Sequence, residues 1–389
     1  MYDKHDISVF LIAIVPFSTF FDFVFKIYGL NIPVSLNVIS IIFLSILIVV
    51  KKPNEINKNS ALILALLSLM YIFQLLNYTV NYGEFNAFKS KFATLSLTLI
   101  YGLIISLTPL NEKKILVILG HISSFSSVIF LMVYPKIFYG GTLENEEFVS
   151  LYMHAGTLSG VGILSYYLLM KEEIAISKSK LLLLITINII ALVVSGSRGP
   201  LIFMLAVILF DIFLMQRNIK SIFYMLLAFF GFSCFLGIMY FISQDQVAIL
   251  FDRSISRMLD LFNSGNESRE NMLNFAFGSN EYISIVIGKG FSSFGIDYNN
   301  HDIYGYPHNI FAELYYEGGL VSMFLFMSVL YVYFKSVRQR KSILFLLFIF
   351  ILLMSMKSFS LSGNRFLILF ILINSLSWGR FLRMNKIEK

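Results

Sequence analysis

Charged residues are scarce in this chain of 389 residues, and cysteine is almost absent. Only 14% of the residues are charged and 57% are hydrophobic, whereas soluble domains usually carry about 25% charged residues. This composition excludes an ordinary soluble globular domain. The one cysteine, Cys234, excludes a disulfide within the chain.

The sequence motifs of common metal and nucleotide sites are also missing. There is no Asp-x-Asp pair, no His-x-x-x-His, no Cys-x-x-Cys and no Gly-x-x-x-x-Gly-Lys loop. We therefore expect no metal and no cofactor, and a cytoplasmic catalyst that uses nucleotide sugars is disfavoured. No internal repeat is visible either, although many secondary transporters consist of two related halves.

Apolar runs recur along the whole chain at the length that a helix needs to cross a membrane. We predict an all-α polytopic membrane protein, a single integral membrane domain over residues 1–389, with about 12 transmembrane helices of about 20 residues each. The expected spans are residues 7–25, 33–50, 60–78, 90–108, 115–133, 148–170, 181–196, 200–216, 221–243, 307–333, 342–357 and 362–378.

The basic residues indicate how the chain is oriented. With the amino terminus inside, most of the 30 Lys and Arg residues fall in cytoplasmic segments. Short basic loops stay in the cytoplasm, so we expect both termini on that side. The net charge of +7 is then mostly a signal of topology. No lysine run or DNA-binding motif indicates a nucleic-acid partner.

One long segment, residues 244–306, is expected on the external side. From Gln246 to Phe262 apolar residues recur at helical spacing, and Arg253 and Arg257 share another face of that helix. Residues 264–267, Ser-Gly-Asn-Glu, have the pattern of a capping box that opens a second helix through about Phe277. We predict a large helical extracytoplasmic loop that forms a lid over a cleft at membrane level.

Arg198 is the first candidate for ligand binding. It occupies a short external turn, Ser195–Gly199, between two apolar runs. Arginine binds phosphate through its planar fork of N–H donors, and glycines allow the backbone to approach a ligand closely. The structural alternative is an arginine at the membrane interface that contacts headgroups or pairs with a carboxylate.

The other cationic candidates lie in the loop and near the last external turn. Arg253, Arg257 and Arg269 each have a structural alternative as ion pairs with the acidic residues of the loop. Arg269 is preferred because the capping box would fix its helix near the next span. Lys357 and Arg365 would add positive charge at the same level, although contact with lipid headgroups is favoured for them.

His308 follows Pro307 at the expected start of a helix. A histidine there can serve as a general base near neutral pH, and its alternative is a structural hydrogen bond. Glu313 and Glu317 are four residues apart and deeper in the same span. They could orient the imidazole, bind sugar hydroxyls, or stabilise the bundle by pairing with an arginine.

Taken in order, these segments resemble the bacterial O-antigen ligase and polymerase superfamily over residues 181–334. The earlier spans are similar only in number and hydrophobicity. The resemblance rests on Ser195–Gly199, on Arg253, Arg257 and residues 264–269, on Gly288-Lys289-Gly290-Phe291, and on Pro307-His308-Asn309 leading to Glu313 and Glu317-Gly318-Gly319.

The resemblance implies glycosyl transfer on the outer face of a bacterial cytoplasmic membrane. The donor would be a glycan on undecaprenyl diphosphate. Arg198 and Arg269 would hold the diphosphate, and His308 would activate the acceptor hydroxyl with support from Glu313 or Glu317. Arg253, Arg257 and Asn309 complete the expected substrate-binding set. The expected partners are the undecaprenyl-diphosphate-linked oligosaccharide, membrane lipids, a chain-length regulator and a flippase.

Four functions are compatible with this pattern. The preferred one is a polymerase of O-antigen or capsular repeat units, because the chain resembles those proteins in size and in its Phe, Ile and Tyr richness. The closest alternative is a ligase that passes finished glycan to lipid A core. A transporter or flippase fits the number of spans but not the missing repeat. A scaffold leaves the cationic external turn unexplained.

Overall fold

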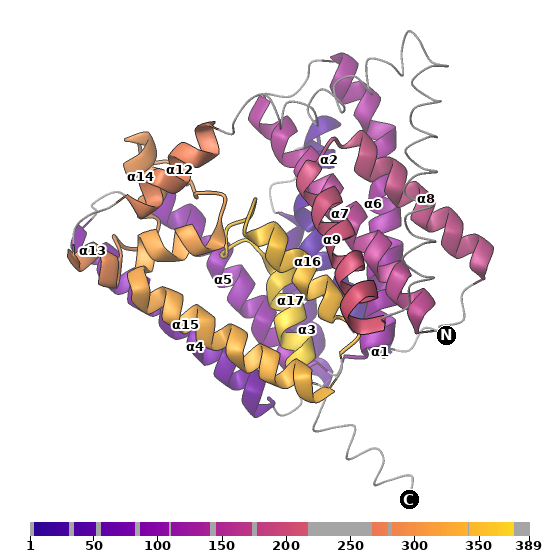
Figure 1. Cartoon of the computed structure of the whole chain (residues 1–389), viewed down its shortest axis with the longest axis horizontal. Helices are drawn as coiled ribbons and strands as arrows, with labels where there is room; N and C mark the ends of the chain where they lie inside the picture. Colours follow the sequence, from indigo (N-terminus) through magenta and orange to yellow (C-terminus); the bar gives the residue numbers. More distant parts are fainter. Residues whose placement is uncertain are drawn as a thin grey trace, which may run out of the picture. The chain divides into compact units, whose positions relative to one another are not determined.

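The computed structural model is helical throughout the residues that it describes, which are 4–30, 35–51, 56–81, 86–108, 110–140, 145–172, 177–216, 267–278, 282–340 and 342–376 (Figure 1). The first half contains α1 (Lys4–Ile14), the short 3-10 helix η1 (Val15–Phe17), α2 (Ser18–Ile27), α3 (Leu36–Lys51), α4 (Lys58–Asn81), α5 (Asn86–Leu107), α6 (Glu112–Gly140), α7 (Asn145–Lys171) and α8 (Lys178–Val194). The second half contains α9 (Arg198–Phe210), the π-helix η2 (Asp211–Gln216), α12 (Glu267–Phe277), α13 (Tyr282–Ile287), α14 (Ser293–Asn299), α15 (Ile310–Arg340), α16 (Phe345–Ser355) and α17 (Arg365–Leu376).

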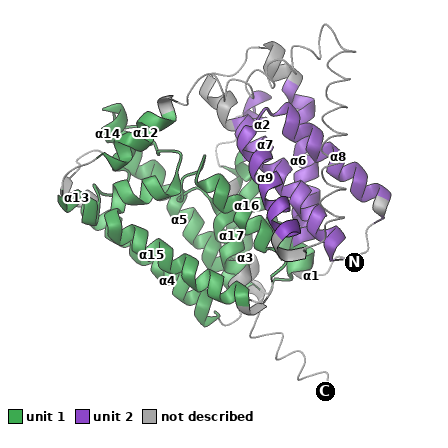
Figure 2. Ribbon diagram, viewed as in Figure 1, with its two compact units in different colours: residues 1–19, 33–115, 266–389 green, residues 20–32, 116–265 purple. Residues whose placement is uncertain are grey.

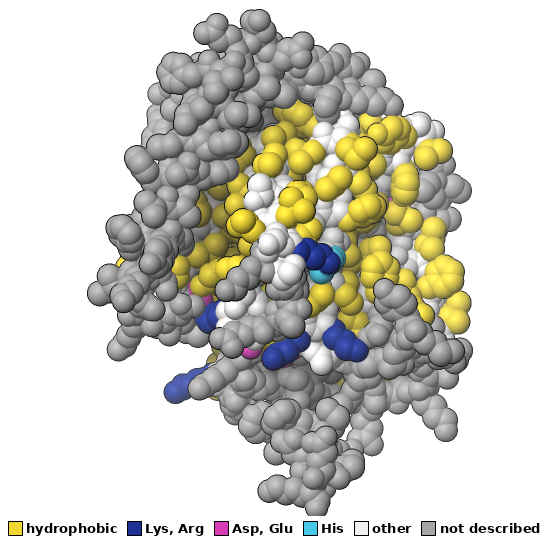
Figure 3. Space-filling model, turned by 90° about the vertical axis from the view of Figure 1, so that its right-hand side faces the viewer, with side chains coloured by type: hydrophobic (Ala, Val, Ile, Leu, Met, Phe, Trp, Pro, Cys, Tyr) yellow, Lys and Arg dark blue, Asp and Glu magenta, His cyan; other side chains and the backbone are white. Residues whose placement is uncertain are grey.

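Several of these helices have the length and composition of membrane spans. Within the described ranges, five stretches are long and apolar enough to cross a membrane: Ile7–Ile27, Lys58–Asn77, Asn86–Leu107, Glu112–Tyr134 and Ile310–Arg338. Hydrophobic side chains cover most of the described surface seen in Figure 3. Large apolar residues such as Phe324 and Tyr331 of α15 are exposed, as expected where a helix contacts lipid. The chain is therefore a multi-pass membrane protein.

The total of twelve spans stays a prediction. The expected span 221–243 lies outside the described residues, as does the helix expected from Gln246 to Phe262. Helix α16 has 11 residues and is shorter than the span expected over residues 342–357, and α17 begins at Arg365 instead of residue 362. Polar residues of the turn between them, residues 356–364, are buried in contacts with other segments instead of continuing either helix.

The described part of the external loop is more structured than its glycines suggested. The helix expected after the capping box is α12, and it ends at Phe277 as predicted. Two further short helices, α13 and α14, follow it. All three pack on α15. Ala276 and Phe294 join Ala312 and Tyr316 of α15 in a small buried core.

The chain forms two compact units, shown in green and purple in Figure 2. The first consists of residues 1–19, 33–115 and 266–389, and the second of residues 20–32 and 116–265. In the first unit, α15 packs along α4, and α5 packs against α3 and α17. This unit also contains α15 and His308, which lies just before that helix.

In the second unit, α7 packs against α8 and α9. Hydrogen bonds between side chains join α6, α7 and α8. Ser127 contacts Ser159 at 2.9 Å and donates to Asn188 at 2.9 Å, and Asn188 donates to Ser124 at 2.7 Å. Small and polar residues of this kind allow membrane helices to approach closely and bond to one another.

Helix α15 is broken at Gly319, and a second glycine segment fills the break. Gly319 has φ 58° and ψ −158°, which is not helical. The carbonyls of Tyr316 and Glu317, just before the break, accept hydrogen bonds from the backbone N–H groups of Lys289 (2.8 Å) and Gly290 (2.9 Å). A broken membrane helix needs such partners because lipid offers none. Backbone hydrogen bonds therefore join the segment Gly288–Gly290 to α15 directly before Gly318 and Gly319.

We predict that Gly319→Ala destabilises the protein. Its backbone conformation is almost restricted to glycine, so another residue costs about 1–3 kcal/mol from strain alone. An added methyl group would also run into the backbone of Val286 and Gly288. Thermal unfolding in detergent should show a clearly lower midpoint for this variant.

The matched control is Gly363→Ala. An added methyl group there would meet only the Thr94 side chain, at 3.8 Å. We expect its unfolding midpoint to stay close to that of the wild type. Equal midpoints for all three proteins would show that the break at Gly319 does not depend on glycine.

Candidate functional site

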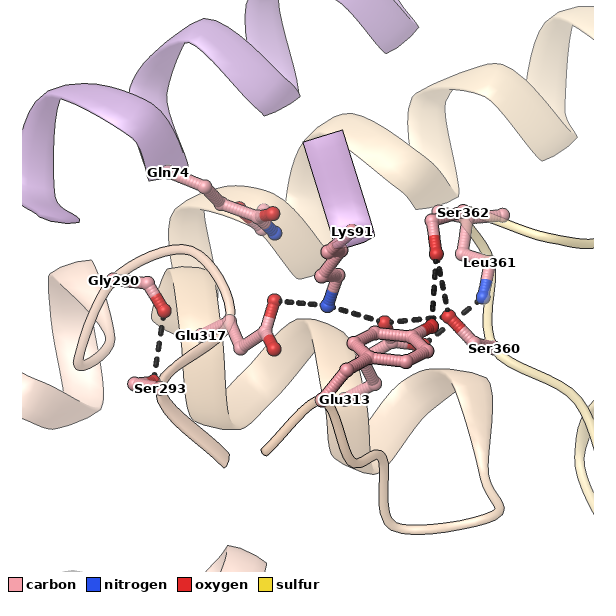
Figure 4. Close-up of polar contacts among 11 residues, drawn as sticks. Gln74, Lys91, Gly290, Ser293, Glu313, Glu317, Ser360, Leu361 and Ser362 are labelled. Atoms are coloured by element: carbon pink, nitrogen blue, oxygen red, sulfur yellow. Dashed lines mark hydrogen bonds and ion pairs between the residues drawn. The ribbon is translucent and has the colours of Figure 1, made fainter. Parts of the chain in front are cut away.

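A buried lysine, Lys91 of α5, lies between the two carboxylates of α15. Its Nζ is 2.5 Å from Glu313 Oε1 and 2.5 Å from Glu317 Oε2 (Figure 4). All three side chains are at most 3% exposed. Residues four apart share one face of a helix, so both glutamates point to the same lysine. The sequence left their role open, and the structure pairs them with a lysine instead of an arginine.

Glu313 also binds the turn between α16 and α17. Its Oε1 accepts from Ser360 Oγ at 2.8 Å, and its Oε2 accepts from the backbone N–H of Leu361 at 2.9 Å. Ser360 in turn contacts Ser362 Oγ at 2.8 Å. A carboxylate with this many donors is well stabilised away from water. Glu313 therefore joins three segments of the first unit: α5, α15 and the 356–364 turn.

His308 lies in the extended segment between α14 and α15, not inside a helix. Helix α15 begins at Ile310, and Asn309 caps it, because Asn309 Oδ1 accepts from the N–H groups of Phe311 (2.9 Å) and Ala312 (3.1 Å). The expectation that His308 opens the helix was therefore wrong by two residues. His308 itself has φ 52°, an uncommon conformation for a residue with a side chain.

The same turn that binds Glu313 holds the segment before His308. Tyr304 Oη lies 3.1 Å from Ser362 Oγ, and Tyr306 Oη donates to the carbonyl of Ser358 at 3.3 Å. The rings of Tyr306 and His308 have centroids 4.7 Å apart. The backbone and side chains around His308 are thus fixed from two sides, by aromatic contact and by the 356–364 turn.

The environment of His308 favours the neutral imidazole. Burial lowers the pKa of His308, the positive charge of Arg269 lowers this pKa further, and a hydrogen bond to the Ser358 backbone opposes both effects. Its Nδ1 is buried, and among the described residues it has no hydrogen-bond partner. A neutral imidazole with an unused nitrogen can accept a proton near neutral pH.

Arg269 is close enough to His308 for its charge to act on the imidazole. It lies in the first turn of α12, partly exposed, and α12 packs on α15. Burial raises the pKa of the neighbouring Tyr306, and the charge of Arg269 opposes that rise. The structure thus brings together two of the three residues predicted to be catalytic, a cation and a candidate base.

Arg198 begins α9 in the second unit. Gly196 has φ 62°, and Ser197 Oγ donates to the carbonyl of Tyr152 at 2.8 Å. Gly156 of α7 leaves no room for a side chain against Ser195 and Ser197. The turn is therefore held firmly by α7. The expected meeting of Arg198 with His308 concerns residues of different units and stays a prediction.

Residues 181–327 match the family model described as O-antigen ligase. The match supports the resemblance of this stretch to the O-antigen ligase and polymerase superfamily. It runs from α8 into α15 and covers less than half of the chain. No curated protein matches the chain. The matched stretch contains all the predicted site residues: Arg198, Arg253, Arg257, Arg269, His308, Asn309, Glu313 and Glu317.

Two residues of the superfamily pattern, Arg253 and Arg257, lie outside the described residues. Within the described part of the chain, no group of three or more His, Cys, Asp or Glu side chains has the arrangement of a metal site. Arg365, expected at the lipid headgroups, is only 7% exposed at the start of α17. That cation is enclosed by protein.

Sequence analysis missed the residues that hold the segment around His308 in place. Lys91 and the serines of the 356–364 turn lie outside residues 181–327. A lysine at the start of an apolar run was the available signal for Lys91, since a charge there is costly unless it is paired. Nothing in the local sequence indicated that Ser360 or Tyr304 would join it.

We predict that His308 titrates below the usual histidine pKa of about 6.5. Diethyl pyrocarbonate modifies neutral imidazole, so the modification of His308, followed by mass spectrometry against pH, reports this pKa. The half-maximal rate should fall below pH 6.5. Arg269→Gln removes a neighbouring positive charge, so its half-maximal point should move to higher pH.

Arg338→Gln is the matched control, since Arg338 is an exposed arginine at the far end of α15. Its titration of His308 should follow that of the wild type. An unchanged titration in Arg269→Gln would show that Arg269 does not act on the imidazole.

Proposed function

We propose that the protein is a polysaccharide polymerase. It joins undecaprenyl-diphosphate-linked repeat units into an O-antigen or capsular chain on the outer face of the cytoplasmic membrane, with both termini in the cytoplasm. The observation that carries this proposal is the half-buried His308, whose pKa is lowered by burial and by the charge of Arg269, within the stretch that matches the family model.

In the proposed reaction, a hydroxyl of the acceptor sugar attacks the anomeric carbon of the donor glycan. The new bond joins the hydroxyl oxygen to that carbon, and the bond from the same carbon to the diphosphate breaks. His308 takes the hydroxyl proton, and the electron pair leaves with undecaprenyl diphosphate. General base catalysis of this kind typically contributes about 10²–10⁴-fold.

Arginine side chains have the second role in this proposal. The departing diphosphate gains charge, and fixed cations aimed at developing charge lower the barrier most effectively. Arg269 and Arg198 would supply that charge, and the fork of a guanidinium matches phosphate oxygens. Arg253, Arg257 and Asn309 would contact the rest of the substrate. The side-chain oxygen of Asn309 caps α15. The side-chain NH2 group of Asn309 would then be the part that contacts a ligand.

A ligase is the second candidate, because the description of the matching family is O-antigen ligase. It would use the same donor and the same residues but pass the glycan to lipid A core. The two functions differ in the acceptor. A polymerase binds a second lipid-linked glycan, whereas a ligase binds one core lipid and releases the product.

We expect purified protein, incubated with short undecaprenyl-diphosphate-linked repeats alone, to produce a ladder of chain lengths on a gel. A parallel reaction contains the same donor together with lipid A core. Transfer to the core lipid without a ladder in either reaction would contradict the polymerase and establish the ligase. His308→Ala should remove the product in both cases while the protein still inserts in the membrane.

We also predict that Arg198→Lys lowers the turnover. Lysine keeps the positive charge but loses the fork, and one charge-assisted bond is worth about 1.5–3 kcal/mol, which corresponds to roughly 10- to 100-fold. Arg338→Lys makes the same change at an exposed position of α15 and should leave the rate unchanged. Wild-type turnover in Arg198→Lys would mean that Arg198 only anchors its helix.

A further inference from the structure

We propose that Lys91 is a positioning residue for His308. It holds Glu313 as the anchor of the 356–364 turn, and that turn fixes the segment in which His308 lies. The proposal rests on the proposed function only in taking His308 as the base. Lys91 lies outside the stretch that matches the family.

The first step is the difference between the two carboxylates that share Lys91, which lies 2.5 Å from each. Glu313 uses both oxygens, with Lys91 and Ser360 as donors to Oε1 and the Leu361 N–H as donor to Oε2. Glu317 accepts from Lys91 at Oε2 and has a further hydrogen bond to the Ser292 backbone. The ion pair with Glu313 is therefore the one that connects Lys91 to the 356–364 turn.

The second step is the path from Glu313 to the histidine. Ser360, Ser358 and Ser362 are all buried in the turn. Ser362 Oγ contacts Tyr304 Oη, and the carbonyl of Ser358 accepts from Tyr306 Oη. His308 comes two residues after Tyr306, and its ring is tilted against the Tyr306 ring with the centroids 4.7 Å apart. Each link is a short polar or aromatic contact, so a shift of the turn moves the histidine segment with it.

Helix α5 holds the same segment at its other end. The carboxylate of Asp302 accepts from the backbone N–H groups of Asn86 and Ala87, both at 2.8 Å, in the first turn of α5. These hydrogen bonds lower the pKa of Asp302, so it remains ionised near neutral pH. Lys91 follows on the same helix. The segment from Asp302 to Asn309 is thus fixed to α5 directly at its start and through Glu313 near its end.

This arrangement distinguishes positioning from general support of the bundle. If Lys91 only stabilised the helices, removing its contact would lower the unfolding temperature without changing His308 in the folded protein. If it positions His308, loosening the turn exposes the imidazole and removes its bond to Ser358. The groups that act on His308 are Arg269 on α12 and the Ser358 backbone, together with burial.

The experiment measures the diethyl pyrocarbonate modification of His308 in the full-length protein in detergent, well below the unfolding temperature. We expect Glu313→Gln and Lys91→Met to raise the rate at least about threefold at a pH well above 6.5, where the imidazole is neutral in every variant, because release from burial exposes the ring. The titration midpoint should move toward the usual value. Glu317→Gln, which leaves the hydrogen bonds of the 356–364 turn in place, should stay within about twofold of the wild type.

Two histidines serve as internal controls, and two further variants complete the design. His121 and His154 of the second unit report general loosening, and their rates should not change. Tyr304→Phe removes only the hydroxyl that contacts Ser362 and should show the same direction as Glu313→Gln even if that variant folds poorly. Glu172→Gln makes the same chemical change directly after the end of α7 and should match the wild type.

Unchanged His308 reactivity in both Glu313→Gln and Tyr304→Phe would overturn the proposal, as would an equal rise at His121 and His154. The polymerisation assay tests the proposed function separately from the role of Lys91. With a working wild-type protein, Glu313→Gln should lower kcat more than it changes KM. If the wild type made no polymer, the proposed function would fail, while the modification rates would still decide the role of Lys91.

Discussion

The buried pairing of Lys91 with Glu313 is the interaction on which the rest of the described site depends. A charge inside an apolar span is costly unless it is paired, and removing one partner of a buried pair typically costs about 3–5 kcal/mol. Here the pair links two helices whose residues are 222 positions apart in the chain. The Glu313 carboxylate also accepts hydrogen bonds from Ser360 and Leu361, so the electrostatic requirement also orders the 356–364 turn.

The break in α15 meets a second requirement of the membrane, which is that backbone groups be bonded. Gly319 interrupts the helix six residues after Glu313, and the N–H groups of Lys289 and Gly290 donate to the carbonyls of Tyr316 and Glu317 before it. Phe291, next in sequence, donates its N–H to Gln74 of α4 and places its ring near Lys91. The glycine motif therefore also closes the apolar surroundings of the lysine, and it shields the ion pair.

The sequence allowed the helical membrane fold and the functional stretch to be predicted, because both depend on local signals. Apolar runs mark spans, and the capping box located α12 with its end at Phe277. The charge of Arg269 does act on His308, whose pKa it lowers. The role of Lys91 could not be predicted, since its partners are distant in the chain and no periodicity connects them. The span that contains α16 was overestimated for the same reason, because distant contacts bury the polar turn that follows the helix.

The division between the matched family stretch and the rest of the chain has a physical basis. Residues that would touch a diphosphate or a sugar are limited in type, since few side chains can bind phosphate or accept a proton near neutral pH. The residues that hold them in place have more freedom, because many pairs of polar groups can fix a turn. Lys91 and Ser360 are of this second kind, and both lie outside residues 181–327. Their contacts lie in the first unit together with His308, so the geometry of the candidate base is set by residues outside the family pattern.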